Sequence, residues 1–235
     1  MISKYPKYIE LIGVAGVGKT TVAKILIDES HNVGVSLKMR EVINRNLWLR
    51  LKIFYHILLT LLLVPDIVLL YIVFIRKNFK KTPHVKKIRF NLVNRLIVDY
   101  AVIRYYLKNS NDNILNDEGI IGKLVSLSII SKISITKVMH LIKKLFPKNS
   151  ILIFVKSHPL EALKRERIRD INLPFFDNME HKLKEKFFYE ATANYDQILK
   201  LKNFKPDIKK ISIYNQGNYN ELIDEVKILA KKFIT

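Results

Sequence analysis

The most constraining feature of this sequence is a cluster of glycines near its amino end. The chain has only seven glycines, and three of them, Gly13, Gly16 and Gly18, lie within six residues. Residues 8–12 before the cluster are mostly β-formers, and residues 21–27 after it have helical spacing. The order therefore predicts a strand, a glycine-rich loop and a helix.

The residues from 13 to 20 match the pattern G-x-x-x-x-G-K-[ST] in full. Glycines allow successive backbone N–H groups to converge on phosphate oxygens without a Cβ in the way. Lys19 would reach the β- and γ-phosphates of a nucleotide, and the Thr20 hydroxyl would bind Mg²⁺ at the start of the helix. We therefore expect ATP and Mg²⁺ as ligands, with a nucleotide-binding set that comprises Gly13, Val14, Ala15, Gly16, Val17, Gly18, Lys19, Thr20 and Thr21.

A phosphate loop of this kind needs an acidic residue at the end of another strand to hold Mg²⁺ or its waters. Residues 113–116 read as a strand, and Asp117 and Glu118 follow it directly. We expect Asp117 to serve the metal and Glu118 to orient or deprotonate the attacking group. Asp-Glu-Gly is also a common turn and helix start, so the alternative is a purely structural turn.

Strands and helices are predicted to alternate along the whole chain. Further strands are expected at 33–37, 113–116, 150–155 and 210–214, and helical stretches at 39–108, 119–146, 159–202 and 219–233. Such alternation requires crossover connections and a parallel sheet that is covered on both faces. We predict one α/β domain over residues 1–235, with a helical insertion at 46–108 between the second and third strands.

Composition narrows the classes of protein to which the chain can belong. It has no cysteine, which excludes a disulfide framework, a zinc finger and a thiolate nucleophile. Its 49% hydrophobic content is that of a packed domain and excludes a disordered tail. The net charge of +20 favours a polyanionic or phosphorylated partner without defining the fold. Residues 1–7 are too few and too polar for a signal peptide, so we expect a cytoplasmic protein.

The segment after the predicted fourth strand carries basic side chains at helical spacing. Pro159 suits the first position of a helix, and Arg165 and Arg169, four residues apart, lie on one face of that helix. Two guanidinium groups there could clamp a transferring phosphoryl group and neutralise its charge. The alternative is a solvated helix start whose charged residues are surface neighbours.

In this segment the chain resembles the thymidylate kinase-like and nucleoside kinase branch of the P-loop kinases. It matches the Pro-x-x-Ala-Leu-x-Arg-x-x-x-Arg lid segment of those families position for position, with Pro159, Ala162, Leu163, Arg165 and Arg169. The resemblance implies a three-layer P-loop NTPase fold with a five-stranded parallel sheet and helices on both faces. It also implies Mg·ATP as the phosphate donor and phosphoryl transfer to a small acceptor.

The same resemblance identifies candidate contacts with the acceptor. The families place an Arg-Glu pair after the second strand and often keep further contacts on the helix before the third strand. The matching residues of this chain are Arg40, Glu41, Arg95, Asp99 and Arg104. The chain departs from the families after the third strand, because residues 117–119 read Asp-Glu-Gly and include no arginine. The sequence therefore leaves the identity of the acceptor open.

Residues 57–75 form a run of nineteen residues, of which only three lie outside the apolar set. The length suits a membrane span, but a single crossing would place Lys19 and Asp117 on opposite sides of the membrane. Two alternatives follow. The run is either a hairpin, broken at Pro65, that contacts the cytoplasmic leaflet, or a pair of buried helices packed on the core or on a second subunit. The basic residues around it favour contact of 47–89 with an anionic membrane surface.

Two functions from different classes fit these patterns. The first is an ATP-dependent kinase that moves the γ-phosphate to a small hydroxyl- or phosphate-bearing acceptor, with catalytic residues Lys19, Asp117, Glu118, Arg165 and Arg169 and with Thr20 and Asp117 at the metal. The second is an ATP-binding or ATP-hydrolysing membrane adaptor without an acceptor. Nucleic-acid binding ranks below both, because the basic residues adjoin an aliphatic run rather than aromatic side chains. A homo-oligomer is compatible with either function.

Overall fold

The computed structural model describes residues 8–32, 37–39, 55, 83–109, 112–168, 180–201 and 208–233. These residues form a five-stranded parallel sheet with the strand order β2-β3-β1-β4-β5. The strands are β1 (Tyr8–Ile12), β2 (Leu37–Met39), β3 (Asn113–Asn116), β4 (Ser150–Lys156) and β5 (Lys209–Tyr214). Because β1 is central, the loop that follows it lies between the carboxyl ends of β3 and β4.

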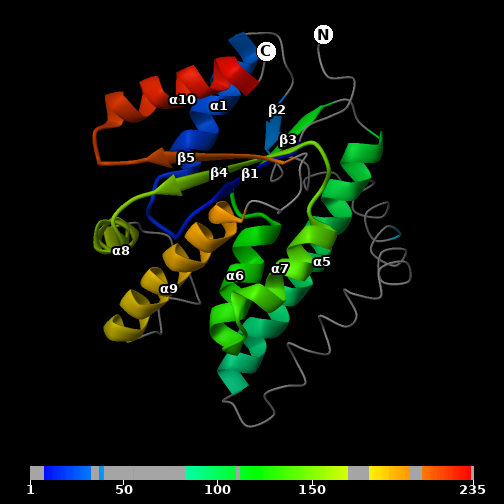
Figure 1. Ribbon diagram of the computed structural model, residues 1–235, viewed down its shortest axis with the longest axis vertical. Coiled ribbons are helices and arrows are strands. Elements are labelled where there is room, and N and C mark those ends of the chain that lie inside the picture. The colour runs from blue at the N-terminus through cyan, green and yellow to red at the C-terminus, as the bar shows by residue number, and fades with distance from the viewer. Residues whose placement is uncertain are drawn as a thin grey trace.

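Helices cover both faces of the sheet (Figure 1). The helices are α1 (Lys19–Asn32), α5 (Pro83–Asn109), α6 (Ile120–Ser131), α7 (Ile135–Leu145), α8 (Pro159–Ile168), α9 (His181–Lys200) and α10 (Tyr219–Phe233). Helices α1 and α10 pack on one face of the sheet, and α5, α6, α7 and α9 lie on the other (Figure 1). The expected parallel α/β architecture is therefore confirmed.

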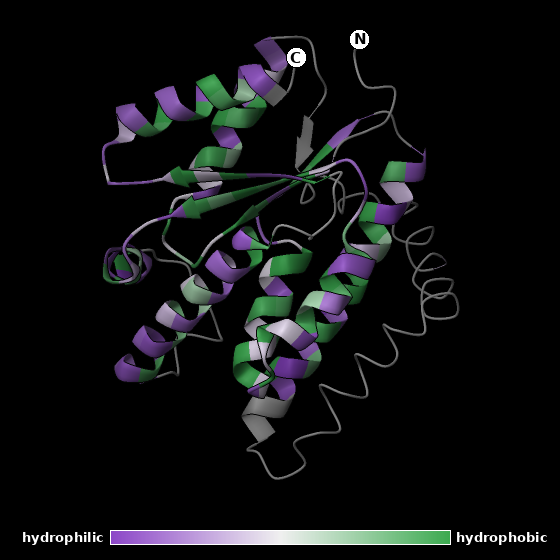
Figure 2. Ribbon diagram, in the orientation of Figure 1, coloured by the Kyte–Doolittle hydropathy of each residue, from purple (hydrophilic) through white to green (hydrophobic). Residues whose placement is uncertain are grey.

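The core consists of the central strands and the inner faces of the helices. All five residues of β1 are buried, as are the first six of β4. Figure 2 shows these strands and helix α6 as largely hydrophobic, with hydrophilic residues on the outer sides of α9 and α10. Burial of such strands between two helical layers supplies the main stabilisation of a parallel sheet. Glu10, in the middle of β1, is the exception, because it is charged and has no exposed surface.

Two of the predicted helical stretches each contain two of the described helices. The stretch 119–146 is interrupted at Lys132, which has a left-handed backbone with φ 53° and donates its N–H to Ile129 O. Ser134 is extended, and α7 begins directly after it. The stretch 159–202 contains α8 and α9. The predicted helical character of both stretches is confirmed for the residues that the structure describes, with a break at 132–134 in the first.

The predicted insertion at 46–108 lies largely outside the described residues. Its last part forms α5, a helix of 27 residues that packs against α6. The apolar run 57–75 is not among the described residues. No described helix combines the length and the hydropathy that crossing a bilayer requires.

Candidate active site

The loop after β1 has a backbone that only glycine adopts without strain. Gly13, Gly16 and Gly18 have positive φ angles of 147°, 80° and 98°. A Cβ on Gly13 would lie 2.5 Å from the carbonyl oxygen of Val155, and a Cβ on Gly16 would collide with the carbonyl of Ala162. The loop is therefore wrapped closely against β4 and α8, and it begins α1 directly at Lys19.

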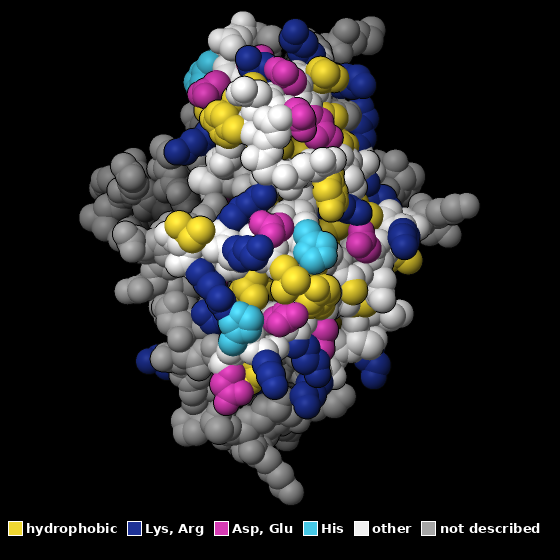
Figure 3. Space-filling view, turned by 90° about the vertical axis from the view of Figure 1, so that its left-hand side faces the viewer, with side chains coloured by type: hydrophobic (Ala, Val, Ile, Leu, Met, Phe, Trp, Pro, Cys, Tyr) yellow, Lys and Arg dark blue, Asp and Glu magenta, His cyan; other side chains and the backbone are white. Residues whose placement is uncertain are grey.

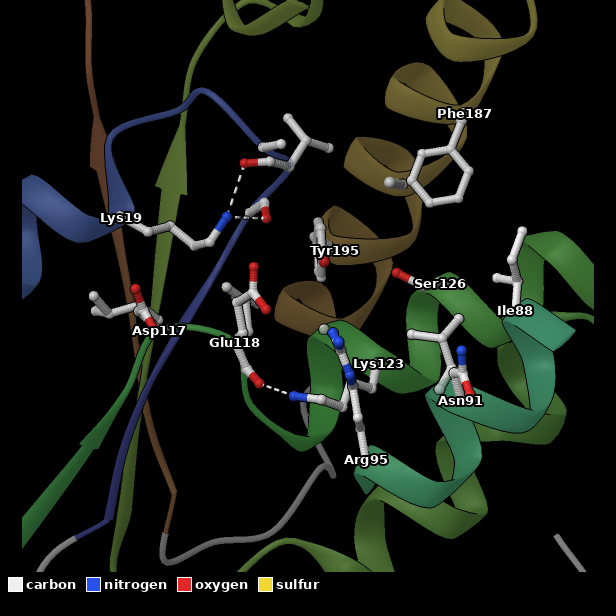
Figure 4. Close-up of a pocket in the computed structure, with 18 of the residues that line it drawn as sticks. Lys19, Ile88, Asn91, Arg95, Asp117, Glu118, Lys123, Ser126, Phe187 and Tyr195 are labelled. Atoms are coloured by element: carbon white, nitrogen blue, oxygen red, sulfur yellow. Dashed lines mark hydrogen bonds between the residues drawn. The ribbon is translucent and has the colours of Figure 1, made fainter. Parts of the chain in front are cut away.

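Lys19 is held against this loop. Its Nζ donates hydrogen bonds to the carbonyl oxygens of Gly13 at 2.8 Å and Val14 at 2.9 Å (Figure 4). These contacts place the ammonium group between the loop and the residues that follow β3. The position suits the neutralisation of nucleotide phosphates, the role expected for Lys19 from the sequence.

Thr20 and Asp117 come together although they are far apart in the sequence. The Thr20 hydroxyl donates to Asp117 Oδ2 at 3.4 Å. A hydroxyl and a carboxylate oxygen beside a phosphate loop are the ligand types that Mg²⁺ binds in P-loop proteins. The two residues that the sequence assigned to the metal therefore fit that ion. Thr21 follows, half-buried in the first turn of α1.

A cavity of about 420 Å³ opens beside Lys19 on the α5, α6 and α9 side of the sheet. One wall is the phosphate loop with Asp117 and Glu118, and the others come from the three helices (Figure 4). The helical lining comprises Lys87, Ile88, Asn91, Leu92 and Arg95 of α5, Gly122, Lys123 and Ser126 of α6, and Phe187, Ala191 and Tyr195 of α9. A cavity of this size accommodates a small organic molecule.

The structure brings some of the predicted acceptor residues to this cavity and not others. Glu118 is exposed at its rim, and Arg95 points into it from α5 (Figure 4). Arg104 is exposed further along α5 and does not line the cavity. Arg40 and Glu41 lie outside the described residues.

Asp99 does not contact the cavity, so its prediction as an acceptor contact was wrong. It has no exposed surface, and its Oδ2 lies 2.5 Å from Lys123 Nζ. Lys123 also donates a hydrogen bond to the backbone carbonyl of Glu118. Asp99 is therefore an ion-pair partner behind the wall of the cavity.

The lid arginines are described only in part, because Arg169 lies outside the described residues. Arg165 is half-buried on α8 and approaches the loop between β5 and α10, where a Cβ on Gly217 would lie 3.1 Å from its Nη2. That loop also touches the phosphate loop, since Asn215 Nδ2 donates to Val17 O at 2.8 Å. Arg165 is thus near the phosphate loop but does not line the cavity.

Sequence reasoning missed Glu10, which lies directly behind the site. Its carboxylate accepts hydrogen bonds from the Tyr8 hydroxyl and from backbone N–H groups at the start of α6. Burial raises the pKa of Glu10 to about 7, although the bonds from Tyr8 and Ile121 act in the opposite direction. The one available signal was a charged residue inside an otherwise apolar strand.

Comparison with solved structures identifies the architecture. Deoxyadenosine kinase from M. mycoides with the products dCMP and dCDP superposes with a TM-score of 0.55 at 15% identity, covering 96% of this chain and 99% of that one. The same enzyme with bound dATP gives a TM-score of 0.53 at 14% identity, covering 96% and 98%. The chain has the P-loop kinase fold. No family model and no curated protein matches the sequence.

The P-loop kinase fold accounts for the place of the site. In open α/β sheets, ligands bind outside the carboxyl ends of the strands, where the strand order reverses. Here the order β3-β1-β4 places that point at the loop after β1. The thymidylate kinase-like resemblance stays a prediction, because the structural likeness establishes the fold alone.

Proposed function

We propose that this protein is an ATP-dependent phosphotransferase that moves the γ-phosphate of Mg·ATP to a small acceptor. The proposal rests on one observation: Lys19, Asp117 and Glu118 line the same cavity of about 420 Å³. A protein that only switches between nucleotide states needs a phosphate loop, but it does not need a cavity for an acceptor beside that loop. A kinase needs both, because donor and acceptor must be held in contact.

The donor would be held by the backbone N–H groups of residues 13–18 and by the ammonium group of Lys19. Thr20 and Asp117 would hold Mg²⁺, which when bound neutralises phosphate charge. Arg165, from the opposite side of the phosphate loop, would add a further positive charge. Catalysis would then consist mainly of positioning and charge neutralisation.

Glu118 is the group best placed to act on the acceptor. Its carboxylate would accept the proton of an acceptor hydroxyl while the hydroxyl oxygen bonds to the γ-phosphorus. The bond between the γ-phosphorus and the oxygen that bridges it to the β-phosphate would break, and ADP would leave. Glu118 is exposed, and it lines the same cavity as Lys19 (Figure 4). The reaction balances, because the hydroxyl proton passes to Glu118 and the phosphoryl group to the acceptor oxygen.

The cavity walls indicate the chemistry of the acceptor. Ile88, Leu92 and Phe187 provide an apolar surface on which a planar body can rest. Lys87 and Arg95 lie eight residues apart on α5, the helix that also carries Ile88 and Leu92, and add two positive charges to the lining. We infer an acceptor with a flat or apolar body and a polar or anionic group. Deoxynucleosides and their monophosphates meet this description and are the first class to try, given the fold shared with deoxyadenosine kinase.

A cytoplasmic location and contact of 47–89 with an anionic membrane surface stay proposals, carried by the sequence alone. The basic residues that flank the apolar run 57–75 support the second. We also propose that the protein is of the thymidylate kinase-like subtype and that it can form a homo-oligomer.

The test is transfer of the terminal phosphate of ATP to a panel of deoxynucleosides, deoxynucleoside monophosphates and small hydroxy acids. We expect ADP release to depend on one class of acceptor. Replacement of Glu118 by Gln should lower kcat for that acceptor by about 10²-fold or more. The matched control is Glu161→Gln, because Glu161 is an exposed carboxylate on α8 that forms an ion pair with Lys164 and does not line the cavity. Equal kcat values for Glu118→Gln and the control would remove Glu118 from the mechanism.

A further inference from the structure

Helix α6 begins without the features that usually cap a helix. Its N-cap is Gly119, which has no side chain, and its first turn contains no acidic residue. The first N–H groups of a helix have no partner within the helix and need one from elsewhere. In this protein the partner is Glu10, which comes from the central strand 110 residues earlier in the chain.

The Glu10 carboxylate satisfies three consecutive backbone donors of α6. Oε2 accepts from the N–H of Ile120 at 3.1 Å, and Oε1 accepts from the N–H groups of Ile121 at 2.7 Å and Gly122 at 3.3 Å. The Tyr8 hydroxyl donates to Oε2 at 2.8 Å and fixes the carboxylate from the other side. All four partners are donors, and each carboxylate oxygen accepts from two of them.

Gly119 is needed by this arrangement. A Cβ at this position would collide with the carboxyl group of Glu10. The backbone of Gly119 has an ordinary φ of −83°, so the requirement is for space and not for a special conformation. The third residue of the Asp-Glu-Gly sequence is therefore set by Glu10.

A second buried carboxylate holds the same loop from the side of α5. Asp99 pairs with Lys123 at 2.5 Å, and the same ammonium group donates to the backbone carbonyl of Glu118. Asp99 is fully buried, and the Lys123 side chain is 8% exposed. The ion pair thus fixes a backbone atom of Glu118, whose carboxylate stands at the cavity.

We propose that Glu10 and Asp99 are positioning residues, which together hold the loop 117–119 so that Asp117 and Glu118 face the phosphate loop. The inference rests on the proposed function for the roles of Asp117 and Glu118. It goes beyond that function in assigning the geometry of the loop to two carboxylates that touch neither nucleotide nor acceptor. Besides these two carboxylates, a local hydrogen bond supports the loop, in which the N–H of Glu118 donates to Asn116 Oδ1 at 3.2 Å.

The test measures nucleotide binding in the absence of acceptor, by titration of a fluorescent ATP analogue with and without Mg²⁺. Glu10→Gln introduces an N–H₂ group where only donors face it, and Asp99→Asn releases Lys123. We expect both variants to bind the analogue without Mg²⁺ within twofold of the wild type, because the phosphate loop is unchanged. The enhancement of affinity by Mg²⁺ should fall by about tenfold, because Asp117 is no longer fixed.

The control is Asp196→Asn, which breaks an ion pair with Lys156 that is also 2.5 Å long, and neither of these two residues lines the cavity. It should keep the full enhancement by Mg²⁺. Should Glu10→Gln fail to fold, Tyr8→Phe removes one donor of four and should reduce the enhancement by about threefold. Enhancement within twofold of wild type in folded Glu10→Gln and Asp99→Asn would overturn the proposal. Absence of phosphate transfer by the wild type would instead contradict the proposed function. The effect of Mg²⁺ on nucleotide binding by the variants could still be interpreted in that case.

Discussion

Glycine at position 16 makes the closest approach between the phosphate loop and helix α8. Its φ of 80° is a conformation that costs other residues roughly 1–2 kcal/mol, and a Cβ would also collide with the carbonyl of Ala162. The loop therefore cannot keep its shape with any larger residue there. Residue size, rather than charge, sets the geometry of the nucleotide site at this position.

A pair of glycine substitutions tests this point. Gly16→Ala should lower the free energy of unfolding by about 2 kcal/mol or more and weaken ATP binding. Gly122→Ala should raise the free energy of unfolding by about 0.5–1 kcal/mol, since Gly122 is helical and an added Cβ would meet only the Tyr195 hydroxyl at 3.8 Å. Denaturant titration of both variants measures the two changes. Equal effects of the two substitutions would contradict the account of the loop.

The titration of Glu10 should appear in the pH dependence of stability. Its folded pKa of about 7 lies above the usual 4.5, so the folded state retains a proton that the unfolded state releases. Its contribution to stability is therefore full below pH 4.5 and is lost as the pH rises to about 7. The neighbouring groups are Tyr8, Asp99, Lys123 and Tyr195, of which the two tyrosines stay neutral because burial raises the pKa of each.

We expect Glu10→Gln to remove this pH dependence. Between pH 4.5 and 7.5 the wild type should lose on the order of 3 kcal/mol relative to the variant. Urea unfolding of both proteins across that range gives the difference, in which all other titrations cancel. Parallel stability curves would show that Glu10 keeps an ordinary pKa in the folded protein.

At the scale of elements, α8 connects two parts of the nucleotide site. Its buried face packs on the phosphate loop, and Arg165 lies beside the loop between β5 and α10. That loop is organised by its own side chains, since Asn215 Oδ1 accepts from the N–H of Gly217 at 3.0 Å and its Nδ2 binds Val17 O. Movement of α8 would therefore change the surroundings of the phosphates.

The lid prediction can be tested on the two arginines of α8 that the structure describes. Arg165→Ala should lower kcat by about tenfold or more, because a positive charge near the transferring phosphate is lost. Arg167→Ala should leave kcat unchanged, since Arg167 is exposed two residues along the helix. Steady-state kinetics with the identified acceptor makes the comparison. Equal kcat values in the two variants would show that Arg165 does not contribute to catalysis and that α8 has a structural role only.

The elements also show which predictions the sequence allows. The phosphate loop could be predicted because its chemistry lies within eight consecutive residues. The end of α6 could not, because Lys132 adopts a left-handed backbone that usually signals glycine. The role of Glu10 was also hidden, because its backbone partners at the start of α6 lie 110 to 112 residues away and no local pattern connects them to it. Asp99 was misassigned for the same reason, as its burial depends on the packing of α5 on α6.

At the scale of the whole molecule, the positive charge is unevenly distributed along the chain. Residues 38–108 contain fifteen basic and three acidic residues, a net charge of +12 out of +20. On the face drawn in Figure 3, Lys and Arg side chains lie in several groups, with Asp and Glu side chains among them. By the count along the sequence, most of the excess charge lies in residues 38–108, which include the apolar run 57–75.

This distribution predicts binding to anionic membranes. The full chain should float with vesicles that contain anionic lipid at low salt and should be released as the salt concentration rises. Vesicles of neutral lipid should retain less protein. Equal recovery in the soluble fraction with both kinds of vesicle would contradict the membrane proposal and leave the site unaffected.

The central claim is that the cavity beside Lys19 receives a phosphate acceptor. The most direct measurement follows the terminal phosphate of labelled ATP in the presence of a small-molecule extract of the cells that produce the protein. We predict that the label passes to an organic acceptor, and that Lys19→Ala abolishes this transfer while the variant keeps the circular dichroism spectrum of the folded protein. Release of the label solely as inorganic phosphate, at a rate that the extract does not change, would contradict the claim.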